Sequence, residues 1–252
     1  MTNTATIRSM TMTIQTLKEQ LQNLHLRGME AILDETLKKA ATNNLSPADV
    51  LLILAEQEIA LRKQKLIKAR IAQAAFPTRK TIDAFDFNFP KAINKSQILT
   101  LFDLQFVDQQ QNVILMGPPG TGKTHIALSL GYQACQKGCK TIFTTAMNLI
   151  NHLSASLADN SFLKTMKLYK SPQLIIIDEL GYLPIDKQGA ELLFQVISDR
   201  YECGSVIVTT NRAFRDWGNI LNNDNTLASA AIDRLIHHGT LVQIKGDSYR
   251  IK

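Results

Sequence analysis

The N-terminal part of the chain has apolar residues at helical spacing and carries no strand signal. They recur every three or four residues over 14–24 and, after a possible break at Gly28, again over 32–37. This spacing predicts an amphipathic helical stretch, and Asn43 and Asn44 end it. The pattern therefore begins with helix rather than sheet.

A second helix is predicted from Pro47 to about Ala75. Ser46 precedes it as an N-cap, and Asp49 lies three residues further on, as in a capping box. Pro77 stops it, because the residue before a proline disfavours helical dihedrals. Together, the two stretches predict a small all-helical N-terminal domain, residues 1–78, for contact with DNA or a partner.

From Asn112 onward, short β-rich runs alternate with helical segments. The runs are almost continuously apolar, which is typical of parallel strands that are covered on both faces. The predicted strands are 113–116, 141–144, 174–178, 206–210 and 241–244, and the helices include 125–137 and 190–201. The fold class predicted for residues 79–252 is α/β, a three-layer αβα sandwich around a parallel sheet.

Phe85, Phe87 and Phe89 alternate with polar residues in a segment between the two domains that we expect to be extended. One face of the segment is therefore apolar. Packing of this face against the α/β domain is favoured over base stacking.

The composition of the chain limits its domain sizes, its partners and its location. The 252 residues are 45% hydrophobic, which suits one domain of moderate size and a smaller one. The net charge of +6, from 28 basic and 22 acidic residues, favours polyanionic partners. Cys135, Cys139 and Cys203 form an odd set without paired metal spacing, so we expect reduced, half-buried thiols. No apolar run is long enough to span a membrane and the N-terminal residues lack an apolar signal core, so we expect a cytoplasmic protein without a membrane partner.

The strongest basic cluster lies in the latter half of the second helix and just beyond it. One interpretation is a solvated helix face with a Glu58 to Arg62 ion pair. The other, equally favoured, is a strip that neutralises nucleic-acid phosphates. The candidate DNA-binding residues are Arg62, Lys63, Lys65, Lys68, Arg70, Arg79 and Lys80.

Residues 117–124 match the phosphate-binding pattern G-x-x-x-x-G-K-[ST] at every fixed position. An apolar run leads into them and a helical segment follows, which is the strand, loop and helix setting that the pattern requires. We expect Lys123 to reach the β and γ phosphates of ATP and Thr124 to ligate Mg²⁺. The predicted nucleotide contacts are Gly117, Pro118, Pro119, Gly120, Thr121, Gly122, Lys123, Thr124 and His125.

Polar residues follow two further predicted strands. Asp178 and Glu179 end one buried run and Asn211 follows the next, and ligands of open α/β sheets bind at these strand ends. We expect Asp178 to hold Mg²⁺, Glu179 to activate the attacking water, and Asn211 to sense the γ-phosphate.

Arg234 is the candidate for charge stabilisation supplied from a neighbouring subunit, because the transferred phosphoryl group carries spread negative charge. A salt bridge to an aspartate is its structural alternative, and Arg212 and Arg215 compete for the role. Arg200 is expected on a helix surface. The adjacent histidines 237 and 238 are interpreted as a helix C-terminus rather than a metal site, because no third ligand is evident.

Four motifs together resemble the IstB-like ATP-binding proteins, helper ATPases of bacterial insertion sequences within the AAA+ class of P-loop NTPases. They are the phosphate loop followed by Thr-His, Ile-Asp-Glu-Leu-Gly-Tyr-Leu-Pro at 177–184, Val-Thr-Thr-Asn-Arg-Ala-Phe-Arg-Asp-Trp-Gly at 208–218, and the ending 233–250 with Asp-Arg-Leu-Ile-His-His-Gly and Gly-Asp-Ser-Tyr-Arg. The resemblance extends through Ala-Phe-Pro near residue 76 and so covers nearly the whole chain.

The resemblance implies ATP hydrolysis, ATP-dependent homo-oligomerisation on double-stranded DNA, DNA bending and delivery of a target site to a cognate transposase. It implies the trans-acting role for Arg234 and a location on the nucleoid. Only about eight residues follow Ile244, so no C-terminal helical lid is expected, and Arg250 is the one arginine that follows the last predicted strand. A DnaC-like replicative helicase loader is the principal alternative, followed by a small-molecule kinase and a scaffold that binds ATP without hydrolysing it.

Overall fold

The chain forms two compact units. The computed structural model describes the backbone of residues 2–249 and the side chains of residues 13–249, so Arg250 lies outside the described residues. One unit ends at Lys68 and the other starts at Ala69, inside helix α3 (Pro47–Gln73). Packing thus groups residues 69–78 with the sheet, whereas the functional division at 78/79 stays a prediction.

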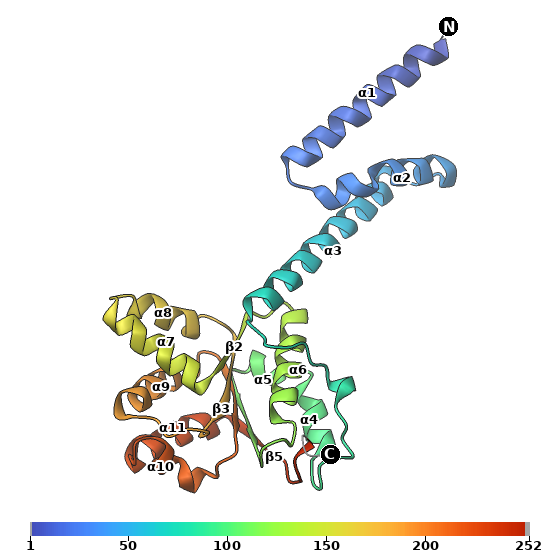
Figure 1. Ribbon diagram of the computed structural model, residues 1–252. Coiled ribbons are helices and arrows are strands. Elements are labelled where there is room, and N and C mark those ends of the chain that lie inside the picture. The colour runs from blue at the N-terminus through green and yellow to red at the C-terminus, as the bar shows by residue number, and fades with distance from the viewer. Residues whose placement is uncertain (1, 250–252) are drawn as a thin grey trace. The chain divides into compact units, whose positions relative to one another are not determined.

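The first unit consists of α1 (Thr2–Asn23), α2 (Arg27–Asn43) and the first part of α3 (Figure 1). The predicted break at Gly28 falls instead at residues 24–26, because His25 adopts a left-handed φ of 57°. The N–H of Leu26 then donates to the carbonyl of Leu21 at 2.8 Å, a hydrogen bond typical of a Schellman C-cap. The predicted stop at Asn43 and Asn44 is confirmed.

Gly28 lies inside α2 because α2 and α3 approach closely there. A Cβ on Gly28 would lie 2.7 Å from the Glu58 Cα. The Gly28 N–H donates to Glu58 at 2.6 Å, and the predicted Arg62 to Glu58 ion pair forms at 2.7 Å. The capping box of α3 is confirmed too, since the Asp49 N–H donates to the Ser46 hydroxyl at 3.2 Å.

The second unit is built on a parallel sheet of five strands in the order β2-β3-β4-β1-β5. All five predicted strands are confirmed, with small shifts at their ends. Their bounds are β1 (Asn112–Met116), β2 (Thr141–Thr145), β3 (Leu174–Leu180), β4 (Ser205–Thr210) and β5 (Gly239–Gln243). Because the strands are parallel, their carboxyl ends share one edge of the sheet, where the predicted site residues follow β1, β3 and β4.

Helices cover both faces of the sheet, as predicted (Figure 1). Successive strand residues point to opposite faces, so Ile175 and Ile177 enter one core while Leu174 and Ile176 enter the other. One face carries α4 (Lys95–Leu101), α5 (Gln105–Asp108) and α6 (Lys123–Gln136). The other carries α7 (Ala146–Ala158), α8 (Phe162–Lys170), α9 (Lys187–Arg200), α10 (Trp217–Ile220) and α11 (Asn225–Ile236). Two 3₁₀ turns, η1 (Ile82–Ala84) and η2 (Phe214–Asp216), lie in connections.

The segment that carries Phe85 and Phe87 packs against the core beneath α4 and α6. The two rings meet edge to face with centroids 4.9 Å apart. The predicted packing is therefore confirmed for Phe85 and Phe87. The segment is not simply extended, because η1 interrupts it directly before Phe85.

The cysteines differ in burial. Cys135 is buried, Cys139 is half-buried and Cys203 is exposed, and all three are free. The expectation of half-burial is therefore confirmed for Cys139 and wrong for the other two. Cys135 is fully buried on α6, and Cys203 follows the C-terminus of α9 in a surface turn. Burial raises the pKa of the Cys135 and Cys139 thiols, so both stay protonated at neutral pH.

The expectation that Arg200 lies on the surface is wrong, since this side chain is 1% exposed. Its guanidinium donates to five backbone carbonyls at 2.8–3.3 Å. These belong to residues 169, 170, 172, 173 and 205. Burial lowers the pKa of Arg200 to about 10, which leaves it charged at neutral pH. The side chain thus fastens the α8–β3 connection to the start of β4.

Replacing Arg200 with leucine is expected to lower the free energy of unfolding by about 3–5 kcal/mol, because the buried carbonyls lose a shared donor. Urea denaturation followed by circular dichroism measures the loss. Arg215→Leu is the matched control, because the side chain of Arg215 is 87% exposed, and it is expected to change stability by less than about 0.5 kcal/mol. Equal stability of the two variants would contradict the structural role.

Candidate nucleotide-binding site

The phosphate loop joins β1 to α6 and places Gly122 as the N-cap of the helix. Gly120 and Gly122 have φ values of 77° and 91°, which glycine adopts at little cost. Such a loop turns backbone N–H groups inward at the positive end of a helix. A cradle for a polyphosphate thus follows from the local sequence.

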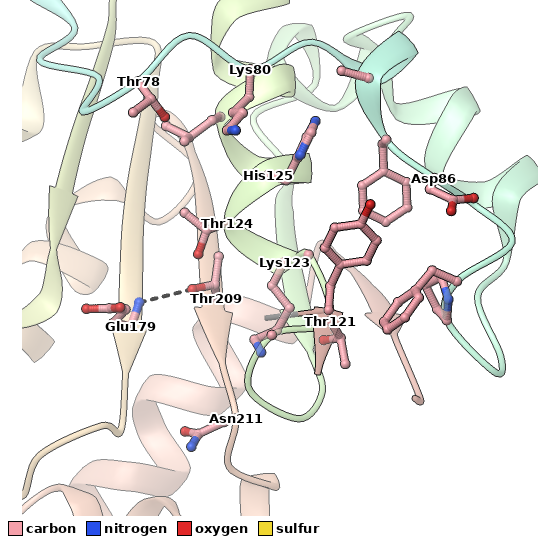
Figure 2. A pocket seen from close by; sticks show the side chains of 18 of the residues that line it. Thr78, Lys80, Asp86, Thr121, Lys123, Thr124, His125, Glu179, Thr209 and Asn211 are labelled. Atoms are coloured by element: carbon pink, nitrogen blue, oxygen red, sulfur yellow. Dashed lines mark hydrogen bonds between the residues drawn. The ribbon is translucent and has the colours of Figure 1, made fainter. Parts of the chain in front are cut away.

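Lys123 is the first residue of α6 and is only 8% exposed. Its ammonium group donates to the carbonyls of Gly117 and Pro118, each at 2.7 Å, which holds it over the loop (Figure 2). The next residue, Thr124, donates its hydroxyl to Asp178 at 2.9 Å. The structure therefore brings the predicted loop and the predicted carboxylate strand together.

Asp178 is buried at 4% exposure near the carboxyl end of β3. Besides Thr124, it accepts a hydrogen bond from the hydroxyl of Thr209 on β4. The Thr124 hydroxyl and the Asp178 carboxylate are oxygen donors of the type that Mg²⁺ prefers. These residues fit a magnesium ion shared with a nucleotide.

Glu179 has an unusual backbone conformation. Its φ is 61° inside β3, where the β3–β4 register shifts. The backbone N–H donates to the Thr209 hydroxyl at 3.0 Å (Figure 2). A left-handed glutamate is strained, and strain of this kind clusters at functional sites. This conformation leaves the carboxylate exposed at the edge of a cavity.

Asn211 lies directly after β4 and lines the same cavity. Its side-chain oxygen is buried and has no hydrogen-bond partner among the described residues. An unsatisfied buried acceptor is costly, and here it faces a site where a water molecule or a bound group has space. This orphaned oxygen supports the predicted sensor position.

The cavity has a volume of about 510 Å³, which is a normal size for a small-molecule site. Loop residues 120–124 form one part of it, and Glu179, Thr209 and Asn211 form another. These are the groups that a Mg²⁺-bound ATP requires, so the residues present fit both cofactors.

The sequence reasoning missed a third part of the cavity wall. It comes from the segment before β1, from the loop after β3, from β4 and from the end of the described chain. These residues are Pro77, Thr78, Ala84, Phe85, Asp86, Phe89, Pro90, Tyr182, Thr210 and Tyr249. The alternating phenylalanines were the available signal, and it indicated packing but not a ligand site.

His125 lines the cavity at the start of α6. Its Nε2 lies 2.8 Å from the carbonyl of Thr81, and its ring packs edge to face on Phe85 with centroids 5.4 Å apart. It therefore ties the segment before β1 to the phosphate loop. The proline pair at 118 and 119 is exposed and does not line the cavity.

Arg234 is half-buried on α11 and lies away from the cavity. Its guanidinium donates to the carbonyl of Ala230 at 3.1 Å and lies 4.8 Å from the Phe194 ring centroid. The Arg234 carbonyl accepts from Asn112, the first residue of β1, at 3.2 Å. Arg234 thus lies at the amino-terminal edge of the sheet, opposite the phosphate loop of its own chain.

The two competing arginines follow β4. Arg212 is exposed, and its Nε donates to the Gly181 carbonyl at 3.4 Å. Arg215 is exposed, and its Nε lies 3.8 Å from the Asp216 carboxylate. The ion-pair partner of Asp216 is therefore its sequence neighbour Arg215. None of the three arginines lines the cavity.

The basic cluster falls into both units. In the first unit, Arg62, Lys63, Lys65 and Lys68 are exposed. At 3.6 residues per turn, Lys65 and Lys68 share one face of α3, whereas Lys63 points elsewhere. Arg62 is three residues before Lys65 and lies on that face too, so three of the four cations follow one stripe of α3 and Lys63 lies off it.

The remaining members of the cluster lie in the second unit. Arg70 is half-buried and donates to the Gly138 carbonyl at 3.3 Å. Arg79 lies 4.8 Å from the Tyr132 ring centroid, and Lys80 lines the nucleotide cavity. In addition to carrying a positive charge, Arg70 and Arg79 therefore each make a contact within the second unit, and Lys80 borders its cavity.

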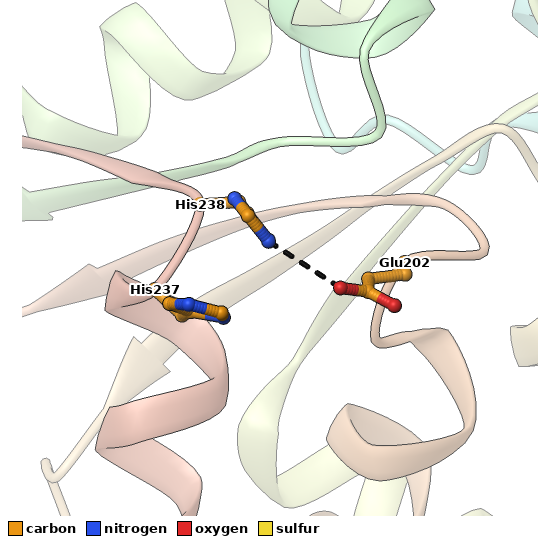
Figure 3. Close-up of side chains that lie close together, drawn as sticks. All are labelled: Glu202, His237 and His238. Atoms are coloured by element: carbon orange, nitrogen blue, oxygen red, sulfur yellow. Dashed lines mark ion pairs between the residues drawn. The ribbon is translucent and has the colours of Figure 1, made fainter.

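The histidine pair has a third metal-ligating side chain in range, which the sequence did not reveal. Glu202 lies with His237 and His238 so that one ligand atom from each falls within 4.8 Å of the others (Figure 3). His238 and Glu202 are 3.4 Å apart, while His237 hydrogen-bonds Tyr201. His237 also caps α11, as predicted. All three side chains are exposed, and the contacts of His238 with Glu202 and of His237 with Tyr201 accompany their arrangement.

Among residues 2–249, no helix combines the length and apolar character that crossing a bilayer requires.

Comparison with known proteins agrees with the geometry of the site. The sequence profile described as IstB-like ATP binding protein matches residues 19–252. The ATP-binding protein of insertion sequence IS232 from Bacillus thuringiensis subsp. berliner is 42% identical over 94% of this chain and 95% of its own length. Its counterpart in insertion sequence IS5376 from Geobacillus stearothermophilus is 39% identical over 93% of each chain.

Among solved structures, the DnaC helicase loader superposes with a TM-score of 0.54 at 22% identity, over 66% of this chain and 96% of the loader. This similarity supports the P-loop AAA+ fold. The profile match and the insertion-sequence relatives go further, and on their strength the chain belongs to the IstB-like family of ATP-binding proteins.

Proposed function

We propose that this protein is an ATP-dependent helper of transposition that assembles as a homo-oligomer on duplex DNA, hydrolyses ATP to ADP and phosphate, and presents the DNA to a cognate transposase. The observation that carries the enzymatic part is the convergence of Thr124, Glu179 and Asn211 on one cavity, with Asp178 hydrogen-bonded to Thr124 beside it. The relatives named after insertion sequences support the transposition part. The proposed location is the cytoplasm, on the nucleoid.

The proposed roles follow from the placement of the side chains. The loop N–H groups and Lys123 bind the phosphates. Thr124 and Asp178 would hold Mg²⁺, which would supply positive charge to neutralise the phosphoryl oxygens. Glu179 accepts a proton from the attacking water. Asn211 contributes a neutral dipole beside the γ-phosphate.

Arg234 acts in trans in this proposal. It lies at the sheet edge opposite its own phosphate loop, so it reaches a nucleotide only in a neighbouring subunit. Arg234→Ala is expected to keep the ATP affinity of the monomer and to lower turnover in the assembled state by about 100-fold or more. Phosphate release and nucleotide titration measure the two quantities.

Mixing Arg234→Ala with Lys123→Ala subunits gives a sharper test. Where a Lys123→Ala subunit presents its Arg234 to the nucleotide site of an Arg234→Ala subunit, both parts of that site are intact. Part of the turnover should therefore return. The variants Arg212→Ala and Arg215→Ala serve as matched controls for the competing arginines. Full turnover in Arg234→Ala alone would overturn the assignment.

The DNA-binding part is tested by sedimentation of the protein with duplex DNA without nucleotide, with ADP and with a non-hydrolysable ATP analogue, at two salt concentrations. Large complexes are expected only with the analogue, because ATP shifts DNA binding only as far as it prefers the assembled form. Higher salt should weaken them, since phosphate contacts release counterions. Affinity that ignores both nucleotide and salt would contradict the proposal, and absence of binding in every state would favour the helicase-loader alternative.

The paired substitution Lys65→Glu and Lys68→Glu tests the basic cluster within the same assay. Both side chains are exposed on one face of α3, so the fold should persist while the complexes weaken and the salt dependence becomes shallower. The control is Lys39→Glu with Glu35→Lys, which reverses an exposed ion pair of α2 without changing net charge. Unchanged DNA complexes would place the main DNA contact on other residues.

A further inference from the structure

The last described residues return to the phosphate loop. This tail segment, residues 245–249, follows β5 and is anchored at its start. Lys245 and Ala92 exchange two backbone hydrogen bonds of 2.9 and 3.0 Å. An exposed ion pair of 2.8 Å joins Lys91 to Asp247. The segment therefore has a defined path alongside residues 91 and 92.

The end of the tail segment lies on the phosphate loop itself. The Tyr249 N–H donates to the carbonyl of Gly120 at 3.0 Å. A Cβ on Gly120 would lie 2.0 Å from the Ser248 hydroxyl oxygen, so glycine at 120 is required by this contact as well as by its φ of 77°. The loop and the tail segment are consequently packed together without intervening space.

The ring of Tyr249 joins the aromatic side of the cavity. It meets Phe89 edge to face, with centroids 4.7 Å apart and an interplanar angle of 81°. Both rings line the cavity, together with Phe85, Pro90 and Leu128. Residues 120–124 present polar groups to the same cavity, and Tyr249 adjoins them at Gly120. The cavity thus combines polar groups suited to a polyphosphate with an apolar, aromatic lining.

We propose that Tyr249, held by the tail segment, forms with Phe89 the wall against which the adenosine part of ATP packs. The phosphates contact the polar groups, so the nucleoside extends along the apolar lining, and aromatic rings there provide face and edge contacts to a base. This inference deepens the nucleotide-binding part of the proposed function. It is independent of DNA and of a transposase.

The test is calorimetric titration of the full chain with two magnesium-bound probes, the β,γ-methylene analogue of ATP and inorganic tripolyphosphate. Tyr249→Ala is expected to raise the Kd of the ATP analogue about tenfold and to change that of tripolyphosphate less than about twofold. Tyr249→Phe, which keeps the ring, should bind both probes as the unmodified protein does. Tyr201→Ala, at a tyrosine outside the cavity, is the matched control.

Melting temperatures without ligand establish that each variant is folded. An unchanged Kd of the ATP analogue in Tyr249→Ala would overturn the proposal. Equal weakening of both probes would also overturn it, because the tail segment would then only support the loop. The Kd values of the two probes do not depend on DNA. The DNA-binding proposal and the proposed adenosine wall can therefore be refuted independently.

Discussion

Replacing Lys123 with alanine is expected to raise the Kd of ATP by about 100-fold or more. The ammonium group is held over the loop by two carbonyls at 2.7 Å, close to where the β and γ phosphates are expected. Charge-assisted hydrogen bonds contribute about 1.5–3 kcal/mol each, and a phosphate group offers more charge than a carbonyl. Calorimetric titration with Mg-ATP measures the effect.

The control for this variant is Lys137→Ala. Lys137 follows the same helix at its other end, is exposed, and donates to the carbonyl of Asp103. The Lys137→Ala substitution removes one positive charge at the other end of α6, outside the cavity, so ATP affinity should stay within about twofold of that of the unmodified protein. Equal affinities of the two variants would contradict the phosphate-binding role of Lys123.

Replacing Glu179 with glutamine is expected to separate ATP binding from hydrolysis. The amide keeps the size and backbone preferences of the glutamate, but it accepts no proton from water, so the hydrolysis rate should fall by about 10²–10⁴-fold. ATP affinity should change little, because Lys123, Thr124 and Asp178 remain in place. Single-turnover phosphate release and nucleotide titration measure the two quantities.

The same variant should hold the protein in the proposed DNA-bound assembly, since its conversion to the ADP state is blocked. Sedimentation after addition of ATP would then show complexes that persist, while those of the unmodified protein decay. Glu191→Gln on the exposed side of α9 is the matched control and should hydrolyse ATP normally. Hydrolysis at the normal rate in Glu179→Gln would show that another group accepts the proton.

Most of the secondary structure was predictable because its signals are local. The five strands were indicated by apolar runs, and the start of α3 by the capping pattern at Ser46. The break between α1 and α2 was placed a few residues late, because its position depends on the left-handed His25. Position 28 requires glycine because α3 passes too close for a Cβ there. This contact joins segments that are distant in the sequence.

The candidate site divides in the same way. The loop 117–124 is contiguous and its spacing is sufficient to identify it, whereas Asp178, Glu179 and Asn211 were inferred from their positions after apolar runs. Parallel pairing of β1, β3 and β4 then brings these residues to one edge. Their predicted roles remain predictions, but their proximity is a structural fact.

The sequence by itself determined the phosphate loop and the order of the strands along the chain, because each depends on residues a few positions apart. Only the tertiary structure decided that Arg200 is buried, that Glu202 meets the histidine pair, and that Phe89 and Tyr249 share a wall of the nucleotide cavity. The physical reason is that burial and side-chain contact depend on which distant segments pack together. The spacing of residues along a local stretch of sequence does not specify which distant segments will pack against it.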